Sequence, residues 1–160
     1  MAEAQLPAEG GLGAGRDSVQ FRFREEETVD HPSITVDAFV AQGGGAAVRI
    51  EPGDDVSELE PHIAAIELVE VNFPTFADGR GYTAARRLRE LGYAGELRAV
   101  GDVAVDQLAY MRRCGFDSFA PERALDEADA KAALERWPNV YQPTVDDRTP
   151  IWALRHGGAA

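Results

Sequence analysis

The residues whose types and spacing could carry chemistry are concentrated between residues 72 and 82. This stretch reads Asn-Phe-Pro-Thr-Phe-Ala-Asp-Gly-Arg-Gly-Tyr and joins an aliphatic segment to a helical pattern. Glycines allow a ligand to approach the backbone closely, a helix N-terminus offers unpaired N–H groups, and Arg80 can bind an oxyanion through two N–H donors. A phosphate, sulfate or carboxylate would suit such a loop. Its candidate ligand-binding residues are Asp78, Gly79, Arg80, Gly81 and Tyr82.

The same loop also has a purely structural interpretation. Its two glycines can simply turn the chain, Asp78 can cap that turn, and Arg80 can form an ion pair with an acidic neighbour. The loop lacks the complete glycine fingerprint of dinucleotide-binding proteins and the lysine of a phosphate-binding loop, so its glycines alone do not indicate a nucleotide site. The residues by themselves leave both interpretations open.

Two residues outside the loop are further candidates. Asp102 follows a strand pattern and precedes a helical one, so it is either an acid or base in the site or the N-cap that begins the helix. Arg98 alternates with apolar residues, and it either points into the same pocket or forms a surface salt bridge. His31, His62 and His156 lie far apart and lack the local spacing of a zinc motif. The sequence therefore indicates neither a metal site nor a hydrolytic triad.

Alternating strand and helix patterns must position these residues. Aliphatic strand patterns occupy 46–50, 66–73, 95–100 and 116–119, and helical patterns occupy 54–63, 84–91, 102–111 and 126–137. Repeated βα units favour a parallel sheet with right-handed crossovers. The chain is too short for an eight-fold barrel of about 250 residues. We therefore predict an α/β fold with an open parallel sheet of four or five strands flanked by helices, with a half-barrel-like arrangement as the alternative.

The chain divides into one α/β domain, residues 19–139, and two flanking segments. Residues 1–18 are small and glycine-rich, which predicts a disordered tail because they cannot bury enough apolar surface to offset ordering. Residues 19–23 alternate apolar and polar types and predict a short peripheral strand. Residues 140–160 place Tyr141, Ile151 and Trp152 among prolines and acidic residues, which predicts an extended segment that wraps this domain or a second subunit.

Composition excludes several classes of partner. The formal charge of −12 opposes attraction to nucleic acid and to anionic membranes. The apolar stretches are too short for a membrane span and the N-terminus lacks a secretory signal, so we expect a cytoplasmic protein. The single cysteine, Cys114, is interpreted as a core residue, with a reactive thiol as the alternative. We predict no cofactor, because there is no cysteine pair, cluster ligand set, or flavin or nicotinamide fingerprint.

The loop and its neighbours resemble a bacterial family of unknown function whose members are described as probable oxidoreductases of sulfite reduction. The resemblance rests on 73–82, on Ala-Arg-Arg-Leu-Arg at 85–89, and on 95–102, 106–107 and 113–117. It covers residues 38 to 142. Family members are commonly encoded beside sulfite reductase and phosphoadenylyl-sulfate reductase. The resemblance therefore implies a role in assimilatory sulfate reduction, with sulfite reductase or another sulfur-assimilation enzyme as partner.

Three hypotheses about function follow. The first is an accessory protein that assists the sulfite-reducing machinery by binding rather than by redox chemistry of its own. The second is a small enzyme that acts on an anionic substrate at Asp78, Arg80 and Asp102. The third is a structural subunit of a homo-oligomer. The sequence leaves open whether the protein is an enzyme.

Overall fold

The computed structural model describes residues 18–27 and 29–157. The tail predicted for residues 1–18 therefore lies outside the described residues, apart from its last residue. Among the residues that are described, no helix is long and apolar enough to cross a bilayer.

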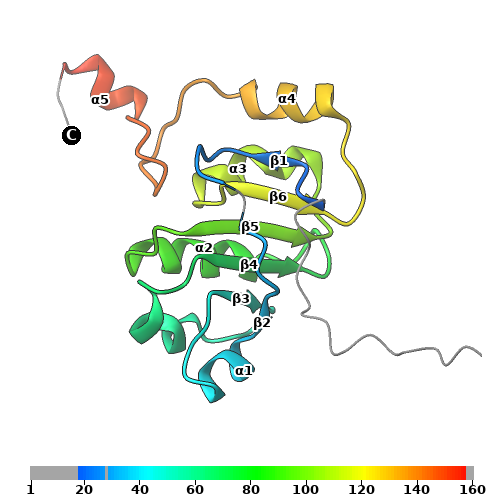
Figure 1. Cartoon of the computed structure of the whole chain (residues 1–160). Coiled ribbons are helices and arrows are strands. Elements are labelled where there is room, and N and C mark those ends of the chain that lie inside the picture. The colour runs from blue at the N-terminus through cyan, green and yellow to red at the C-terminus, as the bar shows by residue number, and fades with distance from the viewer. Residues whose placement is uncertain (1–17, 28, 158–160) are drawn as a thin grey trace, which may run out of the picture.

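A six-stranded sheet forms the centre of the domain (Figure 1), in the order β1-β6-β5-β4-β3-β2. The strands are β1 Phe21–Arg22, β2 Ile34–Thr35, β3 Ala47–Ile50, β4 Leu68–Phe73, β5 Glu96–Gly101 and β6 Ser118–Pro121. Strands β2 to β6 run parallel, and β1 pairs antiparallel with β6. The predicted α/β fold is confirmed. The sheet has six strands rather than four or five because two-residue strands are added at both edges.

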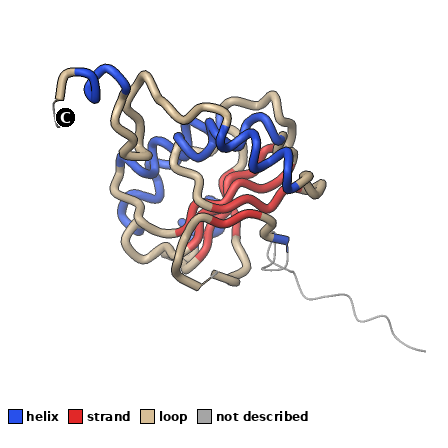
Figure 2. Tube along the Cα trace, turned by 90° about the horizontal axis from the view of Figure 1, so that it is seen from above, coloured by secondary structure: helices blue, strands red, loops and turns tan. Residues whose placement is uncertain are grey.

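The helices form a layer on one side of the sheet (Figure 2). The layer contains α1 Val36–Ala41, η2 Val56–His62, α2 Arg80–Glu90, η3 Val105–Gln107, α3 Leu108–Arg113 and α4 Glu127–Glu135, with η2 and η3 being 3₁₀ helices. A further helix, α5 Ile151–Arg155, lies outside this layer (Figure 1). Strands β2 to β6 are added to the sheet in chain order, so crossovers of one hand place their helices on the same face. Barrels share this progression, but here the sheet stays open between edge strands β1 and β2.

The main hydrophobic core lies between the sheet and this helical layer. Alternate residues of β4, namely Val69, Val71 and Phe73, are buried there with Leu88 of α2 and Met111 of α3. Side chains alternate across a strand, so the intervening residues point to the opposite face. That opposite face is also covered, although by residues near the N-terminus: Arg98 of β5 donates a hydrogen bond to the carbonyl of Val29.

The C-terminal segment differs from the extended conformation that we predicted. Residues 151–155 form α5, which projects away from the sheet (Figure 1). The prolines of the segment end at Pro150, which is the N-cap of α5 and needs no N–H donor there. The residues that follow, Ile-Trp-Ala-Leu-Arg, are compatible with one helical turn.

Candidate functional site

In the loop between β4 and α2, Asp78 and Arg80 form an ion pair with each other. Arg80 donates from Nε to Oδ1 of Asp78 at 3.0 Å and from Nη2 to Oδ2 at 2.7 Å. Oδ1 of Asp78 also accepts the backbone N–H of Arg80 at 3.1 Å, at the first turn of α2. These bonds lower the pKa of Asp78 and raise that of Arg80. An anion that binds Arg80 must therefore compete with a bidentate carboxylate already in place.

Gly81 and Tyr82 lie in the first turn of α2 and pack against Phe73 of β4. A Cβ added at Gly81 would lie 2.5 Å from Cζ of Phe73, so glycine allows α2 to approach β4. The Tyr82 ring packs against Phe73 and Tyr110 at centroid distances of 5.4 and 5.2 Å. Burial raises the pKa of Tyr82 to about 12, so its hydroxyl stays protonated at neutral pH. Around Gly79 there is open space.

A pocket of about 260 Å³ lies beside the start of α2 and includes Arg80 and Gly81 in its lining. Its polar wall comes from the carboxyl ends of β3 and β4. Glu51 accepts from Nδ2 of Asn72 and from Nε of Arg49, both at 2.7 Å. The pocket therefore combines an exposed guanidinium with carboxylates that already have partners.

Asp102 does not begin a helix, so the N-cap prediction is wrong. The N-cap of η3 is Ala104. Asp102 instead accepts the backbone N–H of Phe76 on Oδ2 and a guanidinium N–H of Arg123 on Oδ1, both at 3.0 Å. Gly101, at φ +92°, turns the chain so that Asp102 faces the neighbouring loops. Asp102 thus connects the loops that follow β4, β5 and β6.

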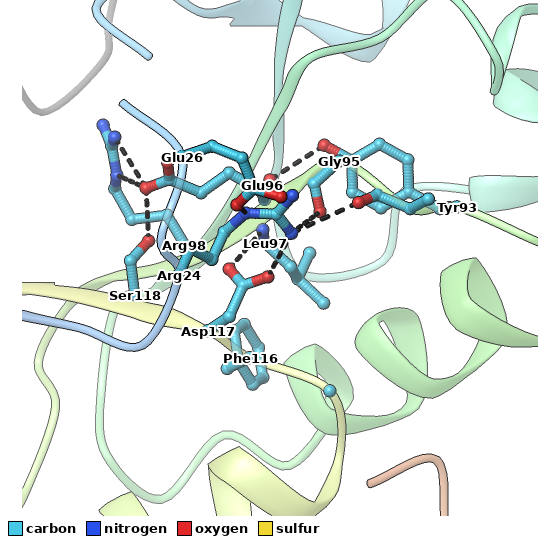
Figure 3. A network of polar contacts seen from close by, with 12 residues as sticks. Arg24, Glu26, Tyr93, Gly95, Glu96, Leu97, Arg98, Phe116, Asp117 and Ser118 are labelled. Atoms are coloured by element: carbon cyan, nitrogen blue, oxygen red, sulfur yellow. Dashed lines mark hydrogen bonds and ion pairs between the residues drawn. The ribbon is translucent and has the colours of Figure 1, made fainter. Parts of the chain in front are cut away.

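Arg98 lies on the opposite face of the sheet, away from the β4–α2 loop. It is fully buried and bonds Glu96 at 2.9 Å and Glu70 at 3.3 Å (Figure 3 shows Arg98, Glu96 and Ser118). The two interpretations offered from the sequence, that Arg98 points into the pocket of the loop or forms a surface salt bridge, are therefore both wrong. Burial acts to raise the pKa of Glu96, but the hydrogen bond from Ser118 and the charge of Arg98 outweigh it and lower the pKa. We call Arg98, Glu96, Glu70 and Ser118 the buried charge cluster.

The candidate residues therefore separate into distinct places. Asp78, Arg80 and Asp102 lie at the carboxyl edge of the sheet, but Arg80 and Asp102 line different pockets. The second of these pockets measures about 510 Å³ and includes Phe76 and Arg123. The local sequence pattern predicted that these residues lie at one edge of the sheet, but it did not predict their ion-pair partners.

Cys114 lies in the core, as interpreted from the sequence. Its side chain is buried at the C-cap of α3, and burial raises the pKa of its thiol. A protonated thiol is a poor nucleophile, which disfavours the reactive-thiol alternative.

A larger pocket, which the sequence reasoning missed, lies between α3, the end of α4 and the C-terminal segment. It measures about 600 Å³. Tyr110, Trp137 and Tyr141 line it and are 54%, 68% and 74% exposed. Its lining also includes three arginines, at 112, 113 and 148. Tyr141 was already noted in the sequence as an aromatic residue of the C-terminal segment, but only the tertiary structure places it beside the arginines. We call this site the aromatic–arginine pocket.

Together these features define a class: an α/β domain with an open, mostly parallel sheet and a helical layer on one face. The chain belongs to the bacterial family described as "Bacterial protein of unknown function (DUF934)", whose model matches residues 47–152. This match confirms the predicted resemblance to a bacterial family of unknown function. No curated protein and no solved structure matches the chain.

Proposed function

We propose that the protein is an accessory factor of assimilatory sulfate or sulfite reduction. It binds sulfite reductase or another enzyme of sulfur assimilation and performs no redox chemistry itself. The link to sulfur assimilation comes from the sequence resemblance. The observation that supports a binding role is the apolar surface of the C-terminal arm, defined as residues 138–157.

The C-terminal arm exposes side chains that globular proteins usually bury. Trp152 and Leu154 of α5 are 46% and 62% exposed, and Tyr141 is more exposed still. Trp152 donates its indole N–H to the Tyr141 carbonyl at 2.9 Å, so part of the arm is ordered by its own contacts. Large aromatic residues are enriched at the centres of protein interfaces, where they contribute much of the binding energy. The arm therefore has the composition of a partner-binding segment.

The carboxyl edge of the sheet favours binding over catalysis for a different reason. Asp78 and Arg80 are paired with each other, and Asp102 is paired with Arg123 and a backbone N–H. A general acid or base needs a pKa close to the working pH. The Arg80 contacts lower the pKa of Asp78 away from that range.

Direct binding to purified sulfite reductase tests the proposal. The full chain, tagged and immobilised, is compared with a Trp152→Ala, Leu154→Ala double variant and with a Phe76→Ala control. Phe76 is 56% exposed but lies in the β4–α2 loop, away from the arm. We expect the wild type and the control to bind sulfite reductase and the arm variant to lose binding. The same comparison is made in extracts of sulfate-grown cells. If the wild type recovers no sulfur-assimilation enzyme, and a deletion strain grows normally on sulfate, the proposal is refuted.

A second function is favoured by one feature of the carboxyl edge. The Arg80 side chain is 64% exposed and lines a pocket with Gly81, which is the arrangement expected for an enzyme acting on a small anion. Thermal stability is measured with sulfate, sulfite, adenylyl sulfate and phosphosugars, for the wild type and for Arg80→Ala. A stabilisation that Arg80→Ala removes supports this function, and the absence of any shift argues against it.

A further inference from the structure

We infer that the aromatic–arginine pocket is a binding site for a planar aromatic ring that carries an anionic group, the chemistry of a single nucleotide. This inference goes beyond the proposed function, because it concerns a small ligand at the base of the C-terminal arm. It rests on the size of the pocket, its aromatic lining and its excess of positive charge.

The dimensions and lining suit a small organic ligand. A volume of about 600 Å³ falls within the range of small-molecule sites, roughly 300 to 1,000 Å³. Tyr110 comes from α3, Trp137 follows α4, and Tyr141 belongs to the arm, so aromatic groups reach the pocket from three segments. Leu134 and Val140 add apolar surface. Exposed aromatic rings provide stacking surfaces for a base, and such stacking contributes about 1–3 kcal/mol per base.

The charge of the pocket is opposite to that of the whole chain. Arg112, Arg113 and Arg148 line it, and Asp146 is its one acidic lining residue. Among the described residues, Arg113 is the only one of the three arginines with an ion pair, at 3.0 Å from Nε to Asp146. The pocket therefore carries a local positive charge in a chain of net charge −12. Guanidinium groups favour phosphate and sulfate because their N–H donors match the oxygens of the anion.

The arginines are held in place before any ligand arrives. Arg112 donates to the carbonyl of Phe116 at 2.8 Å, and its guanidinium lies 4.4 Å from the ring centroid of Phe23. Arg148 donates to the carbonyl of Trp137 at 3.2 Å. These partners are neutral carbonyls, and the acidic charges that act on Arg112 from nearby are those of Asp117 and Asp146. Burial lowers the pKa of Arg112 and outweighs the opposite effect of these two charges, while the charge of Arg89 adds a smaller lowering. An anion in the pocket would raise this pKa again.

Overall charge restricts the ligand to a small one. A nucleic acid strand would bring many phosphates close to a strongly acidic surface, which repels it. A mononucleotide places one ring and one anionic group in the pocket and avoids this repulsion. We therefore expect binding of a nucleoside monophosphate and not of an oligonucleotide.

The two tryptophans of the chain allow a site-specific test. Trp152→Phe leaves Trp137, in the pocket, as the only tryptophan. The full chain with this substitution is titrated with adenosine monophosphate while Trp137 fluorescence is recorded, and calorimetry on the wild type provides a second readout. Adenosine, inorganic phosphate and an acidic peptide containing tyrosine are titrated in parallel. We expect saturable quenching by the nucleotide and binding at least about tenfold tighter than that of adenosine or phosphate.

Variants of the pocket separate the ring from the charge. Tyr141→Ala should weaken nucleotide binding about tenfold without changing the melting temperature, because the ring is largely exposed. Arg148→Ala should weaken the binding of the nucleotide but leave the binding of adenosine unchanged, because adenosine carries no anionic group. Phe76→Ala, outside the pocket, should bind as the wild type does. Melting temperatures of all variants show whether each remains folded.

Several outcomes would overturn the inference. The first is a titration with no saturable response to the nucleotide up to about 5 mM. The second is equal affinity for phosphate and nucleotide. The third is tight binding of the acidic peptide without binding of the nucleotide. Because the titration contains no partner enzyme, its failure leaves the accessory role untouched. Equally, a failed binding assay with sulfite reductase leaves the nucleotide site to be judged by titration.

Discussion

Replacing Arg98 with methionine should destabilise the protein strongly at neutral pH. Methionine has a similar length and fills much of the same space, but it removes the charge shared by Glu96 and Glu70. These two carboxylates are at most 1% exposed, so water cannot replace the lost partner. The substitution also removes the hydrogen bond to the Val29 carbonyl, which connects the N-terminal residues to the sheet.

The magnitude follows from the contacts that remain. Breaking a buried ion pair by removing one partner costs about 3–5 kcal/mol. Oε2 of Glu96 keeps its contact with Arg22 at 3.2 Å, and the hydroxyl of Ser33 still donates to Glu70 at 2.6 Å. These contacts stabilise part of the negative charge, so we expect a loss of about 3 kcal/mol in the free energy of unfolding. The free energy of unfolding of a small domain is roughly 5–15 kcal/mol, so the variant should still fold.

The pH dependence of the loss provides a sharper test. The folded-state pKa of Glu96 is lowered, so its contribution to stability is present above the unfolded pKa of about 4.3. That contribution is lost as the pH falls through the folded pKa. The Arg98→Met substitution removes one of the charges that lower the pKa of Glu96, so this pKa should be lowered less in the variant. The difference in unfolding free energy between variant and wild type should therefore be largest near pH 7 and should shrink below about pH 4.5.

Urea unfolding followed by circular dichroism at pH 7 and at pH 4 measures this difference. Arg98→Lys is the matched control: it keeps a positive charge but loses the planar donor geometry, so its loss should be smaller. A loss under about 1 kcal/mol for Arg98→Met, the value typical of surface pairs, would refute the reasoning. So would a loss that is the same at both pH values.

Three further predictions concern packing, the thiol and a helix cap. Gly81→Ala should reduce the free energy of unfolding by about 1–3 kcal/mol because its Cβ meets the buried Phe73 ring, whereas Gly79→Ala, in open space, should be tolerated; urea melts of both variants compare them. The Cys114 thiol should resist a colorimetric thiol reagent in native buffer and react once urea unfolds the chain, and rapid reaction of the native protein would contradict its burial. Asp126→Ala should cost about 1 kcal/mol in urea unfolding by removing the N-cap of α4, and an unchanged midpoint would show that this cap is unimportant.

The sequence predicted the central part of the fold well because its signals are local. The aliphatic run at 66–73 contains β4, and the run at 95–100 nearly coincides with β5. The helical pattern at 126–137 likewise contains α4, which begins directly after its N-cap Asp126. Two-residue edge strands are too short for alternation to identify their bounds. Strand β1 forms part of the expected strand at 19–23, whereas β2 lies outside the predicted strand patterns.

The sequence by itself determined the order of βα units, membership of the family and the burial of Cys114. Only the tertiary structure decided which charges meet. Asp117 illustrates this: it binds Arg24 and Arg89, which lie 93 and 28 residues away in the chain. The same holds for Arg98 with Glu70 and for the aromatic–arginine pocket. A strand or helix pattern depends on neighbouring residues, whereas the partner of a charge depends on which distant segments pack together, and the local pattern does not encode that choice.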